Sequence, residues 1–450
     1  MPVPTFNRRA FLDTTIQSII GLGLIPSYAA PFRRKGDMQT CGYVYDPLFL
    51  DHSLGVSHPE SPDRLRWINR RLEQSGILAE LTQLSETVEP ESSILDIHTR
   101  EHHDSVNACD PTGAVAQYAV ASILGAVKAV SEGTVTNAFC AIRPPGHHAY
   151  NNGAGADGGS CSGEGFCFYS NAAIAARYAQ NVMNHEKVLI VDWDYHHGNG
   201  TEEAFYADPS VLFFSTHNQL DYPGTGDPRK TGTEEGEGFT INVHMSERSG
   251  NDEFLGVWHD TLLPAAESFQ PDFIIISAGF DSKRDDRLGY FDITPHGFSS
   301  LTKPLMDLAD SCCNGKIVSI LEGGYSDGYS TLFHGLACAV DAHITTLATG
   351  EIQPETDCSV KAAKQKTRSG GHPGLSIRNN SIYVPENIGE IDTVRIVNSS
   401  GQTILRLDGD TVKKQRIRLP SRLSAQGAYL VHISFCSSSK TCVIPYREVR

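Results

Sequence analysis

The sequence predicts an α/β fold with a mainly parallel sheet over residues 31–350, followed by a small all-β module over residues 376–450. Three observations support the first part: its short strands are apolar throughout, they alternate with helical patterns, and distinctive polar residues follow them. Uniformly apolar strands suit a parallel sheet covered on both faces, and their alternation with helices is typical of the α/β class. The expected strands are residues 138–142, 188–192, 211–215, 273–278 and 317–321, and the expected helices are residues 63–74, 115–131, 172–184, 256–268, 298–309 and 332–348.

The C-terminal part of the chain has a different pattern. Residues 351–375 are polar, with several lysines and a Ser-Gly-Gly, and we expect them to be a linker. The segments SIYVP, DTVRIVN, TILRLD, YLVHISF and TCVIPY then alternate at period two between turn residues. This alternation predicts antiparallel strands, and the sequence places no catalytic cluster among them.

The N-terminal 30 residues have the order of an export signal. NRRAFL at residues 7–12 holds paired arginines, a mostly apolar stretch follows at residues 16–25, and small residues follow Pro26. This order is typical of a twin-arginine signal, so we expect residues 1–30 to be a signal peptide, cleaved after Ala29. The protein would then be periplasmic, secreted or on the cell surface of a bacterium. The alternative is an amphipathic N-terminal helix or a membrane anchor, and we expect no other membrane span.

The composition limits the partners of the protein. Its 450 residues are 40% hydrophobic, enough for a large core, and its formal net charge is −16. A negative charge argues against a nucleic acid or an anionic membrane as the main partner, because both favour basic surfaces. Neutral or cationic substrates fit better.

Eleven cysteines raise the question of disulfide bonds in an exported chain. Cys436 and Cys442 flank a short turn between two strand-like runs, which predicts a disulfide between them. Cys312, Cys313 and Cys338 lie in helical or apolar patterns, so we expect them in the core.

The main chemical signal lies at the end of the strand expected at residues 188–192. Asp192, Asp194 and His196 follow one another at spacing two, which puts their side chains on one side of an extended chain. Two carboxylates and an imidazole there favour a metal site, because their burial requires a compensating cation or a hydrogen-bond network. The alternative is a strand end whose aspartates cap turns and whose histidines are solvated.

Polar residues also follow three other expected strands. RPPGHHA presents His147 and His148 on a turn stiffened by two prolines, Asp281 follows FIIISAGF, and Tyr325 follows the glycines of EGGY. Active sites of open α/β sheets lie at the carboxyl ends of the strands. We therefore expect these residues to meet at one edge of the sheet.

Together these residues supply what zinc-assisted amide hydrolysis requires. Three ligands, Asp194, His196 and Asp281, would leave positions for water and substrate open on one zinc ion. The histidine pair can accept and return protons. Tyr325 can donate a hydrogen bond to a developing oxyanion.

The motifs RPPGHHA, GEGFCFYSN, DWDYHHGNG, SAGFD and LEGGY occur in an order that resembles the zinc-dependent histone deacetylase family. The chain is most similar to its class II-like branch and to bacterial histone deacetylase-like amidohydrolases. The resemblance covers residues 42–350, including HPESPDRL near the start. It implies the arginase/deacetylase-type three-layer fold. It also implies a hydrolase that removes acetyl or other short acyl groups from lysine side chains or related amines.

The resemblance implies roles for individual residues, with Asp194, His196 and Asp281 at the zinc ligands. The catalytic set is His148 as general base and acid, His147 paired with Asp192, Asn199 where class II members carry asparagine, and Tyr325 at the oxyanion. The substrate-binding set is Phe166 and Tyr222 along an acyl-lysine tunnel, Leu288 at its rim, Arg64 near its foot, and Gly324. The family also binds structural potassium. One such site would comprise Asp192, Asp194, His196, Ser215 and Thr216, and a second Phe205, Asp208, Val211 and Phe239.

Three features depart from the family pattern or extend it. A Gly/Ser-rich insertion at residues 150–164 precedes GFCFYSN and is expected to reshape the tunnel entrance or an interface. Leu288 stands at the rim where some members select cationic polyamines with an acidic residue, which disfavours a strict polyamine specialist. GQTILRL and LSAQGAYLVHIS in the terminal module resemble sorting domains of the type IX secretion system, and a generic β-sandwich for attachment is the alternative.

Three rival functions are consistent with parts of this pattern. A ureohydrolase with two manganese ions shares the fold, but it needs a second D-x-D where Lys283 stands, and a protonated lysine cannot bind a metal. An acetylpolyamine or other small-amide hydrolase would keep the mechanism. A non-catalytic surface protein would keep only the scaffold.

Overall fold

The computed structural model describes residues 40–55, 58–152, 161, 163–325 and 334–355, and the backbone of six short strands between residues 376 and 435. Three expected features lie outside these residues: the signal at residues 1–30, the disulfide between Cys436 and Cys442, and most of the linker. The domain boundaries therefore stay predictions.

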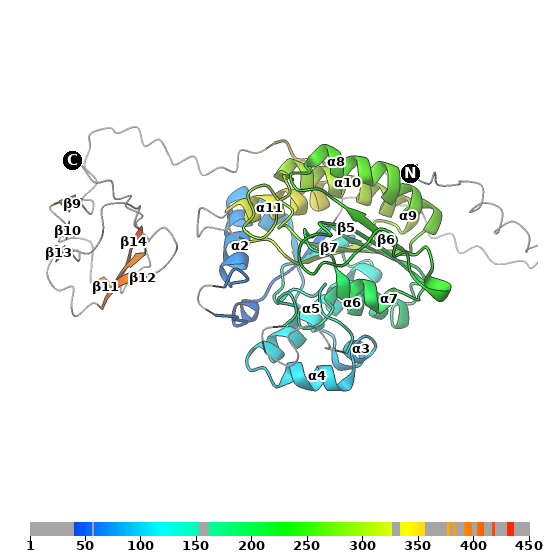
Figure 1. Ribbon diagram of the computed structural model, residues 1–450, viewed down its shortest axis with the longest axis horizontal. Coiled ribbons are helices and arrows are strands. Elements are labelled where there is room, and N and C mark those ends of the chain that lie inside the picture. Colours follow the sequence, from blue (N-terminus) through cyan, green and yellow to red (C-terminus); the bar gives the residue numbers. More distant parts are fainter. Residues whose placement is uncertain are drawn as a thin grey trace, which may run out of the picture. The chain divides into compact units, whose positions relative to one another are not determined.

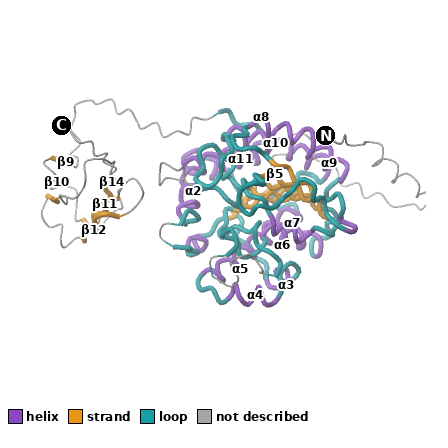
Figure 2. Tube along the Cα trace, viewed as in Figure 1, coloured by secondary structure: helices purple, strands orange, loops and turns teal. Residues whose placement is uncertain are grey.

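Eight parallel strands form one sheet, which lies between layers of helices (Figure 2). In chain order the strands are β1 (Cys41–Val44), β2 (Thr82–Gln83), β3 (Asn137–Cys140), β4 (Val188–Asp192), β5 (Val211–His217), β6 (Thr240–His244), β7 (Phe273–Ala278) and β8 (Ile317–Leu321). Their order in the sheet is β2-β1-β3-β8-β7-β4-β5-β6. The five expected strands are confirmed. The pattern missed β1, β2 and β6, which lie towards the edges of the sheet, where strands are less uniformly apolar.

The register of the sheet brings the strand ends together. Asp192, the last residue of β4, pairs with Ser215 of β5 and with Ser277 of β7. Ser277 in turn pairs with Ile320 of β8. The carboxyl ends of four neighbouring strands therefore lie at one edge, where the candidate site is found.

Helices cover both faces of the sheet. Those that follow the strands are α2 (Asp63–Ser75), α3 (Glu91–Leu95), α4 (Arg100–Asn107), α5 (Thr112–Ser131), α6 (Asn171–Asn181), α7 (Asn199–Phe205), α8 (Asn251–Val257), α9 (Leu263–Phe269), α10 (Pro295–Cys312) and α11 (His334–Thr349). Figure 1 shows α8, α9, α10 and α11 on one face and α5, α6 and α7 on the other. This is the three-layer α/β arrangement that the sequence predicts. The helix expected at residues 256–268 is divided between α8, a π-helical turn at Trp258–Leu262, and α9.

Helix α5 is the helix that bears on the expectation of no further membrane span. Within the described residues it is the helix long and apolar enough to cross a bilayer by length and composition. However, 72% of its apolar window is buried inside the domain, as in a core helix. Its length and apolar character therefore come from packing against the sheet and α6.

The six C-terminal strands form two antiparallel sheets of three strands each. One has the order β13 (Arg416–Arg418), β10 (Ser381–Tyr383), β9 (Ser376–Arg378), and the other β12 (Thr403–Asp408), β11 (Ile391–Val397), β14 (Leu430–Phe435). Antiparallel pairing agrees with the period-two alternation. The strand expected in TCVIPY, at residues 441–446, lies outside the described residues.

The cysteines differ from expectation in two respects. Cys109 forms a disulfide with Cys161, at the end of the insertion, and no sequence pattern indicated this pair. Cys338 is buried, as expected, but it too is disulfide-bonded. Cys313 is a buried free thiol and Cys312 a partly buried one.

Replacing Cys109 and Cys161 together by serine is expected to lower the free energy of unfolding by about 2–5 kcal/mol, because the bond closes a long loop in the unfolded chain. The two residues are 52 positions apart. Urea unfolding without reductant measures the effect, with Cys312→Ser as the control for loss of a free thiol. Equal unfolding midpoints for the parent and the double variant would contradict it.

Candidate active site

Two strand ends bring three metal-ligand side chains together. Asp194 and His196 follow β4, and Asp281 follows β7. One ligand atom from each lies within 4.8 Å of the others. The Nδ1 atom of His196 is 3.1 Å from Asp194 Oδ1 and 3.0 Å from Asp281 Oδ2. The spacing of two therefore places both β4 ligands in one cluster, as predicted.

Main-chain groups hold the two carboxylates in place. The N–H of Tyr195 donates to Asp281 Oδ1 at 2.9 Å, and the N–H of Gly323 donates to Asp194 Oδ2 at 2.9 Å. A Cβ atom on Gly323 would lie 2.3 Å from Asp281 Oδ2 and 2.5 Å from Asp194 Oδ2. This position therefore requires glycine, which explains the first glycine of the EGGY motif.

The donor set fits a zinc ion. Zinc binds carboxylate oxygens and imidazole nitrogens, and a catalytic site has three protein ligands with a position left open. Asp194 and Asp281 are buried, and two buried carboxylates side by side need positive charge. In the metal-free site that charge is a proton. Burial alone would lower the pKa of His196, but Asp194 and Asp281 outweigh burial and raise it to about 10.

The affinity for zinc is expected to rise about tenfold per pH unit between pH 7.5 and pH 9.5, because the metal must displace one proton from His196. The direction follows from the raised pKa of about 10, since the competing protonated form predominates at every lower pH. Competition with a chelating dye across this range measures it. An affinity that does not change with pH would contradict it.

The histidine pair lies beside the ligand cluster with distinct partners for each ring. His147 Nδ1 is 2.9 Å from Asp192 Oδ2, and His148 Nδ1 is 2.6 Å from Asn199 Oδ1. The amide nitrogen of Asn199 faces the His148 carbonyl at 3.4 Å. This orients the amide oxygen towards the ring, so His148 carries its proton on Nδ1. Its Nε2 atom is then the proton acceptor.

The two histidines differ in their protonation. Burial would lower the pKa of His147, but Asp194 and Asp192 outweigh burial and raise that pKa well above its ordinary value. Burial and the neighbouring His147 and His196 hold the pKa of His148 well below its ordinary value. One ring is therefore charged and the other neutral at pH 7, which suits His148 as the base.

Tyr325 lies on the loop that follows β8, and Arg64 of α2 holds that loop. The guanidinium of Arg64 donates from Nε to the Gly324 carbonyl at 2.6 Å and from Nη2 to the Glu322 carbonyl. It also lies 5.1 Å from the centroid of the Tyr325 ring. Burial raises the pKa of Tyr325 well above its ordinary value, so its hydroxyl keeps its proton and can donate it in a hydrogen bond.

Aromatic side chains flank the cluster. Phe166 lies in a tight turn with φ of +72°, and its ring is 4.4 Å from that of His58 and 6.1 Å from that of Tyr325. Tyr222 is 44% exposed, and its ring lies 5.0 Å from His148 and 6.2 Å from His196. The structure thus brings both predicted tunnel residues beside residues of the candidate site.

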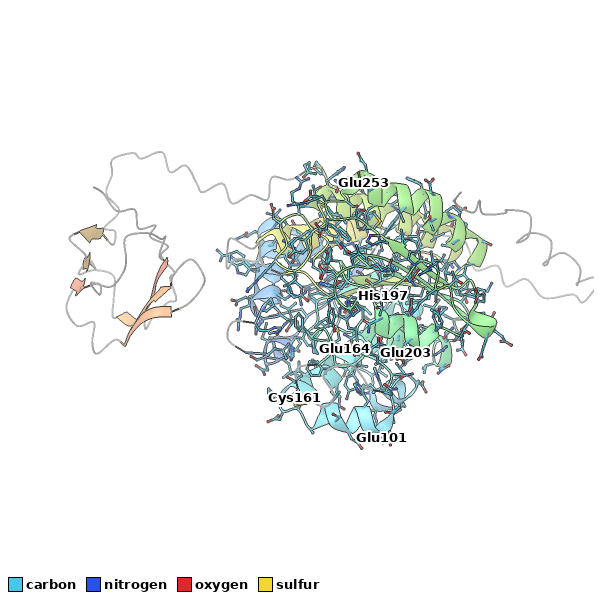
Figure 3. All side chains as sticks on the ribbon, in the orientation of Figure 1. Glu101, Cys161, Glu164, His197, Glu203 and Glu253 are labelled. Carbon is cyan, nitrogen blue, oxygen red and sulfur yellow. A yellow bond between two sulfur atoms is a disulfide. The ribbon has the colours of Figure 1, made fainter. Side chains whose placement is uncertain are left out.

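The turn that presents Phe166 begins at Glu164, which is labelled in Figure 3 together with Cys161. Glu164 and Cys167 exchange main-chain hydrogen bonds of 3.0 and 2.8 Å. Gly165 has φ of +50°, and a Cβ atom on it would lie 2.1 Å from the His148 ring. The turn therefore packs directly on the ring of His148.

The predicted potassium residues have mixed surroundings. Thr216 Oγ1 is buried without a hydrogen-bond partner among the described residues, whereas Ser215 Oγ is 2.8 Å from His217 Nδ1. In the second set, the Asp208 carboxylate is bound by Arg177 at 2.5 Å. Both potassium sites therefore stay predictions.

A buried charge network near the site was not predicted. The Glu60 carboxylate is 2.5 and 2.6 Å from the guanidinium of Arg143 and 3.2 Å from that of Arg64, with His52 Nε2 also at 3.2 Å. All four side chains are fully buried. HPESPDRL contains Glu60 and RPPGHHA contains Arg143, so their motifs were noted, but the pairing joins residues 83 positions apart.

Glu322 and His197 are two further buried residues without a predicted role. Glu322 Oε2 accepts from the N–H groups of Gly146 and His147, while burial raises its pKa to about 7. Its Oε1 atom has no hydrogen-bond partner among the described residues. His197, labelled in Figure 3, is fully buried with Nε2 3.2 Å from Glu202 Oε2. Both motifs that contain them, LEGGY and DWDYHHGNG, were noted from the sequence.

Lys283 argues against a second metal beside the first. Its Nζ atom is 3.2 Å from Asp286 Oδ2, and the side chain is 3% exposed. An ammonium group in a buried ion pair does not bind a cation. The geometry therefore agrees with a single ion at Asp194, His196 and Asp281.

Similarity to known proteins covers most of the described domain. The histone deacetylase domain family matches residues 58–332. Histone deacetylase 5 of Arabidopsis thaliana is 35% identical over 319 residues, which cover 63% of this chain and 46% of the relative. A probable deacetylase of Archaeoglobus fulgidus is 33% identical over 301 residues, covering 63% of this chain and 81% of the relative.

A solved structure agrees with these matches. The crystal structure of the HDA15 HD domain is 34% identical, with a TM-score of 0.62, over 71% of this chain and 91% of that chain. The chain spans half or less of the length of the Arabidopsis relatives at 35% and 39% identity and of the human relative, Histone deacetylase 9. With the family matching more than half of its length, the chain belongs to the histone deacetylase domain family.

Proposed function

We propose that this protein is a zinc-dependent amidohydrolase that removes acetyl or other short acyl groups from N-acylated lysine side chains or related amines. The main support is the cluster of Asp194, His196 and Asp281 within 4.8 Å, beside a neutral His148. Membership of the histone deacetylase domain family supports the same activity. The class II-like assignment follows from the resemblance of the motifs, is supported by Asn199, and stays a prediction.

The protein's own side chains would share the proton transfers. Bound zinc would supply a polarised substrate carbonyl and a more acidic water. His148, neutral and with Nε2 free of the proton, accepts a proton from the water and later returns it to the leaving amine. The charged His147, held by Asp192 at 2.9 Å, adds positive charge beside the reacting atoms. Tyr325 donates its O–H to the developing oxyanion.

Acyl-lysine peptides are the favoured substrate class within this proposal. Leu288 at the rim carries no charge, so it offers no partner for the second ammonium of a polyamine. The exposed ring of Tyr222 offers an apolar surface for the methylene groups of a lysine side chain. An acetylpolyamine hydrolase with the same mechanism is the alternative.

Turnover of an acetyl-lysine peptide and of acetylated polyamines by the zinc-loaded protein tests the proposal. Asp281→Asn removes one ligand charge and is expected to lose both zinc and activity. Faster turnover of polyamines would support the alternative substrate. Bound zinc without turnover of either substrate would contradict the enzyme proposal and favour a non-catalytic surface protein.

We also propose that the protein is exported to the periplasm, the cell surface or the medium. The NRRAFL motif and the disulfide-bonded Cys109, Cys161 and Cys338 support this, because disulfides persist in oxidising compartments. The terminal β module would then serve secretion or attachment. A reporter fused to residues 1–30 should be exported, and Arg8→Lys with Arg9→Lys should retain it in the cytoplasm. Export that is indifferent to this change would contradict a twin-arginine route.

A further inference from the structure

One buried carboxylate connects the loop of Tyr325 to the rim of the site. Asp286 Oδ2 accepts from the main-chain N–H of Tyr325 at 2.8 Å. Its other oxygen, Oδ1, accepts from the main-chain N–H of Leu288 at 2.9 Å. A single side chain therefore positions both the residue proposed to donate to the oxyanion and the residue proposed at the rim.

Lys283 supplies the positive charge that this carboxylate needs. The ammonium lies 3.2 Å from Asp286 Oδ2, the same oxygen that accepts from Tyr325. The two side chains are 3% and 0% exposed, so water does not replace either partner. An ion pair buried in this way is strongly perturbed when one partner is removed, because the other charge is left uncompensated.

The residues around Lys283 hold its side chain towards Asp286. Its Nζ atom also donates to the Asp285 carbonyl at 3.2 Å. Residues 283–286 form a turn, in which the Asp286 N–H donates to the Lys283 carbonyl and Asp285 has φ of +60°. A Cβ atom on Gly335 of α11 would lie 3.5 Å from both Cε and Nζ of Lys283. The ammonium is thus enclosed between its own turn and α11.

We propose that Lys283 is a positioning residue for Tyr325 and acts through Asp286. The ammonium compensates the Asp286 carboxylate, and the carboxylate fixes the main chain of Tyr325 and of Leu288. The residue stands at the position where a two-metal enzyme would carry a further ligand, and here it provides a fixed positive charge instead. The inference rests on the proposed hydrolase function for its effect on rate, but the structural link can be tested without activity.

Hydrogen exchange of the full-length zinc-loaded protein tests the link directly. Lys283→Met is expected to speed exchange at least about tenfold in peptides that contain the Tyr325 and Leu288 amides, since both depend on Asp286. Lys283→Gln, which keeps a donor without the charge, serves if the methionine variant does not fold. Lys303→Met is the matched control, because Lys303 pairs with Asp307 on the surface of α10. Unchanged exchange at both amides in the lysine variants would overturn the proposal, whether or not the protein is active.

A double-mutant cycle with Tyr325→Phe then separates an effect through the tyrosine from general damage. Lys283→Met is expected to lower kcat at least about tenfold with zinc content unchanged, and to change kcat less than about twofold in the Tyr325→Phe background. Equal losses in both backgrounds would overturn a role through Tyr325. A Tyr325→Phe variant as active as the parent would instead contradict the proposed role of the Tyr325 hydroxyl, and the exchange result would still decide the link.

Discussion

Replacement of Tyr325 by phenylalanine is expected to lower kcat about 10²–10³-fold, the usual loss when one oxyanion donor is removed. The change deletes only the hydroxyl. Arg64, whose guanidinium holds the Gly324 and Glu322 carbonyls, keeps the loop in place. The pKa of Tyr325 is raised by burial, so the group lost is a neutral donor and the loss is expected at every pH where the enzyme works.

Steady-state kinetics on an acetyl-lysine peptide, with zinc content measured in parallel, checks this result. Zinc should stay bound, because the proposed ligands are Asp194, His196 and Asp281 and not Tyr325. Tyr290→Phe is a suitable control, since Tyr290 is 49% exposed. Parental kcat in the Tyr325 variant would exclude the hydroxyl from the transition state and leave oxyanion stabilisation to other groups.

Replacement of Glu60 by glutamine is expected to lower the free energy of unfolding by about 3–5 kcal/mol, because removing one partner of a buried ion pair leaves an uncompensated charge. The amide is nearly isosteric with the carboxylate but leaves Arg143 without its counter-charge at 2.5 and 2.6 Å. Arg143 begins the RPPGHHA motif. The histidine pair of that motif, His147 and His148, should therefore lose its fixed position as well, and the proposed activity should fall with stability.

The pH dependence of this contribution has a defined sign. Burial would raise the pKa of Glu60, but Arg143 and His52 together outweigh burial and hold that pKa well below its ordinary value. The stabilisation is therefore fully present above the pKa of an unfolded glutamate, about 4.3, and is lost as the pH falls through the lower folded value.

Urea unfolding of the parent and the variant at pH 7 and at a series of pH values below about 4.3 measures both effects. Glu91→Gln is the matched control, because Glu91 forms an exposed pair with Arg100 and its loss should change little. If Glu60→Gln and the parent unfold at the same urea concentration at pH 7, the network does not stabilise the domain as described.

The group of candidate metal ligands and the central sheet could be predicted because they depend on local geometry. The strand β4 was expected at its observed bounds, and Asp194 and His196 follow it at the period of an extended chain. Asp281 follows the neighbouring strand β7, and parallel strands end at one edge of their sheet. The resemblance to known motifs added roles for His148 and Tyr325, but their convergence was already implied by the strand ends.

Contacts between distant segments could not be predicted in the same way. The pairs Glu60 with Arg143 and Cys109 with Cys161 join residues 83 and 52 positions apart. Lys283 and Asp286 are close in sequence, but their pairing affects the site because Asp286 accepts a hydrogen bond from the N–H of Tyr325, 39 positions further on. None of these contacts has a periodic signal, because each depends on how loops and helices pack around the sheet.

The sequence by itself determined the fold class, the strands that lead to the site and the residues of the candidate metal site, since apolar runs and side-chain alternation follow from the backbone of each segment. The tertiary structure alone decided which charges are compensated in the interior. In the folded protein Glu60 pairs with Arg143, and Lys283, which stands where a two-metal enzyme would need a ligand, pairs with Asp286. The physical reason is that burial makes an unpaired charge costly, and only the folded arrangement shows which partner removes that cost.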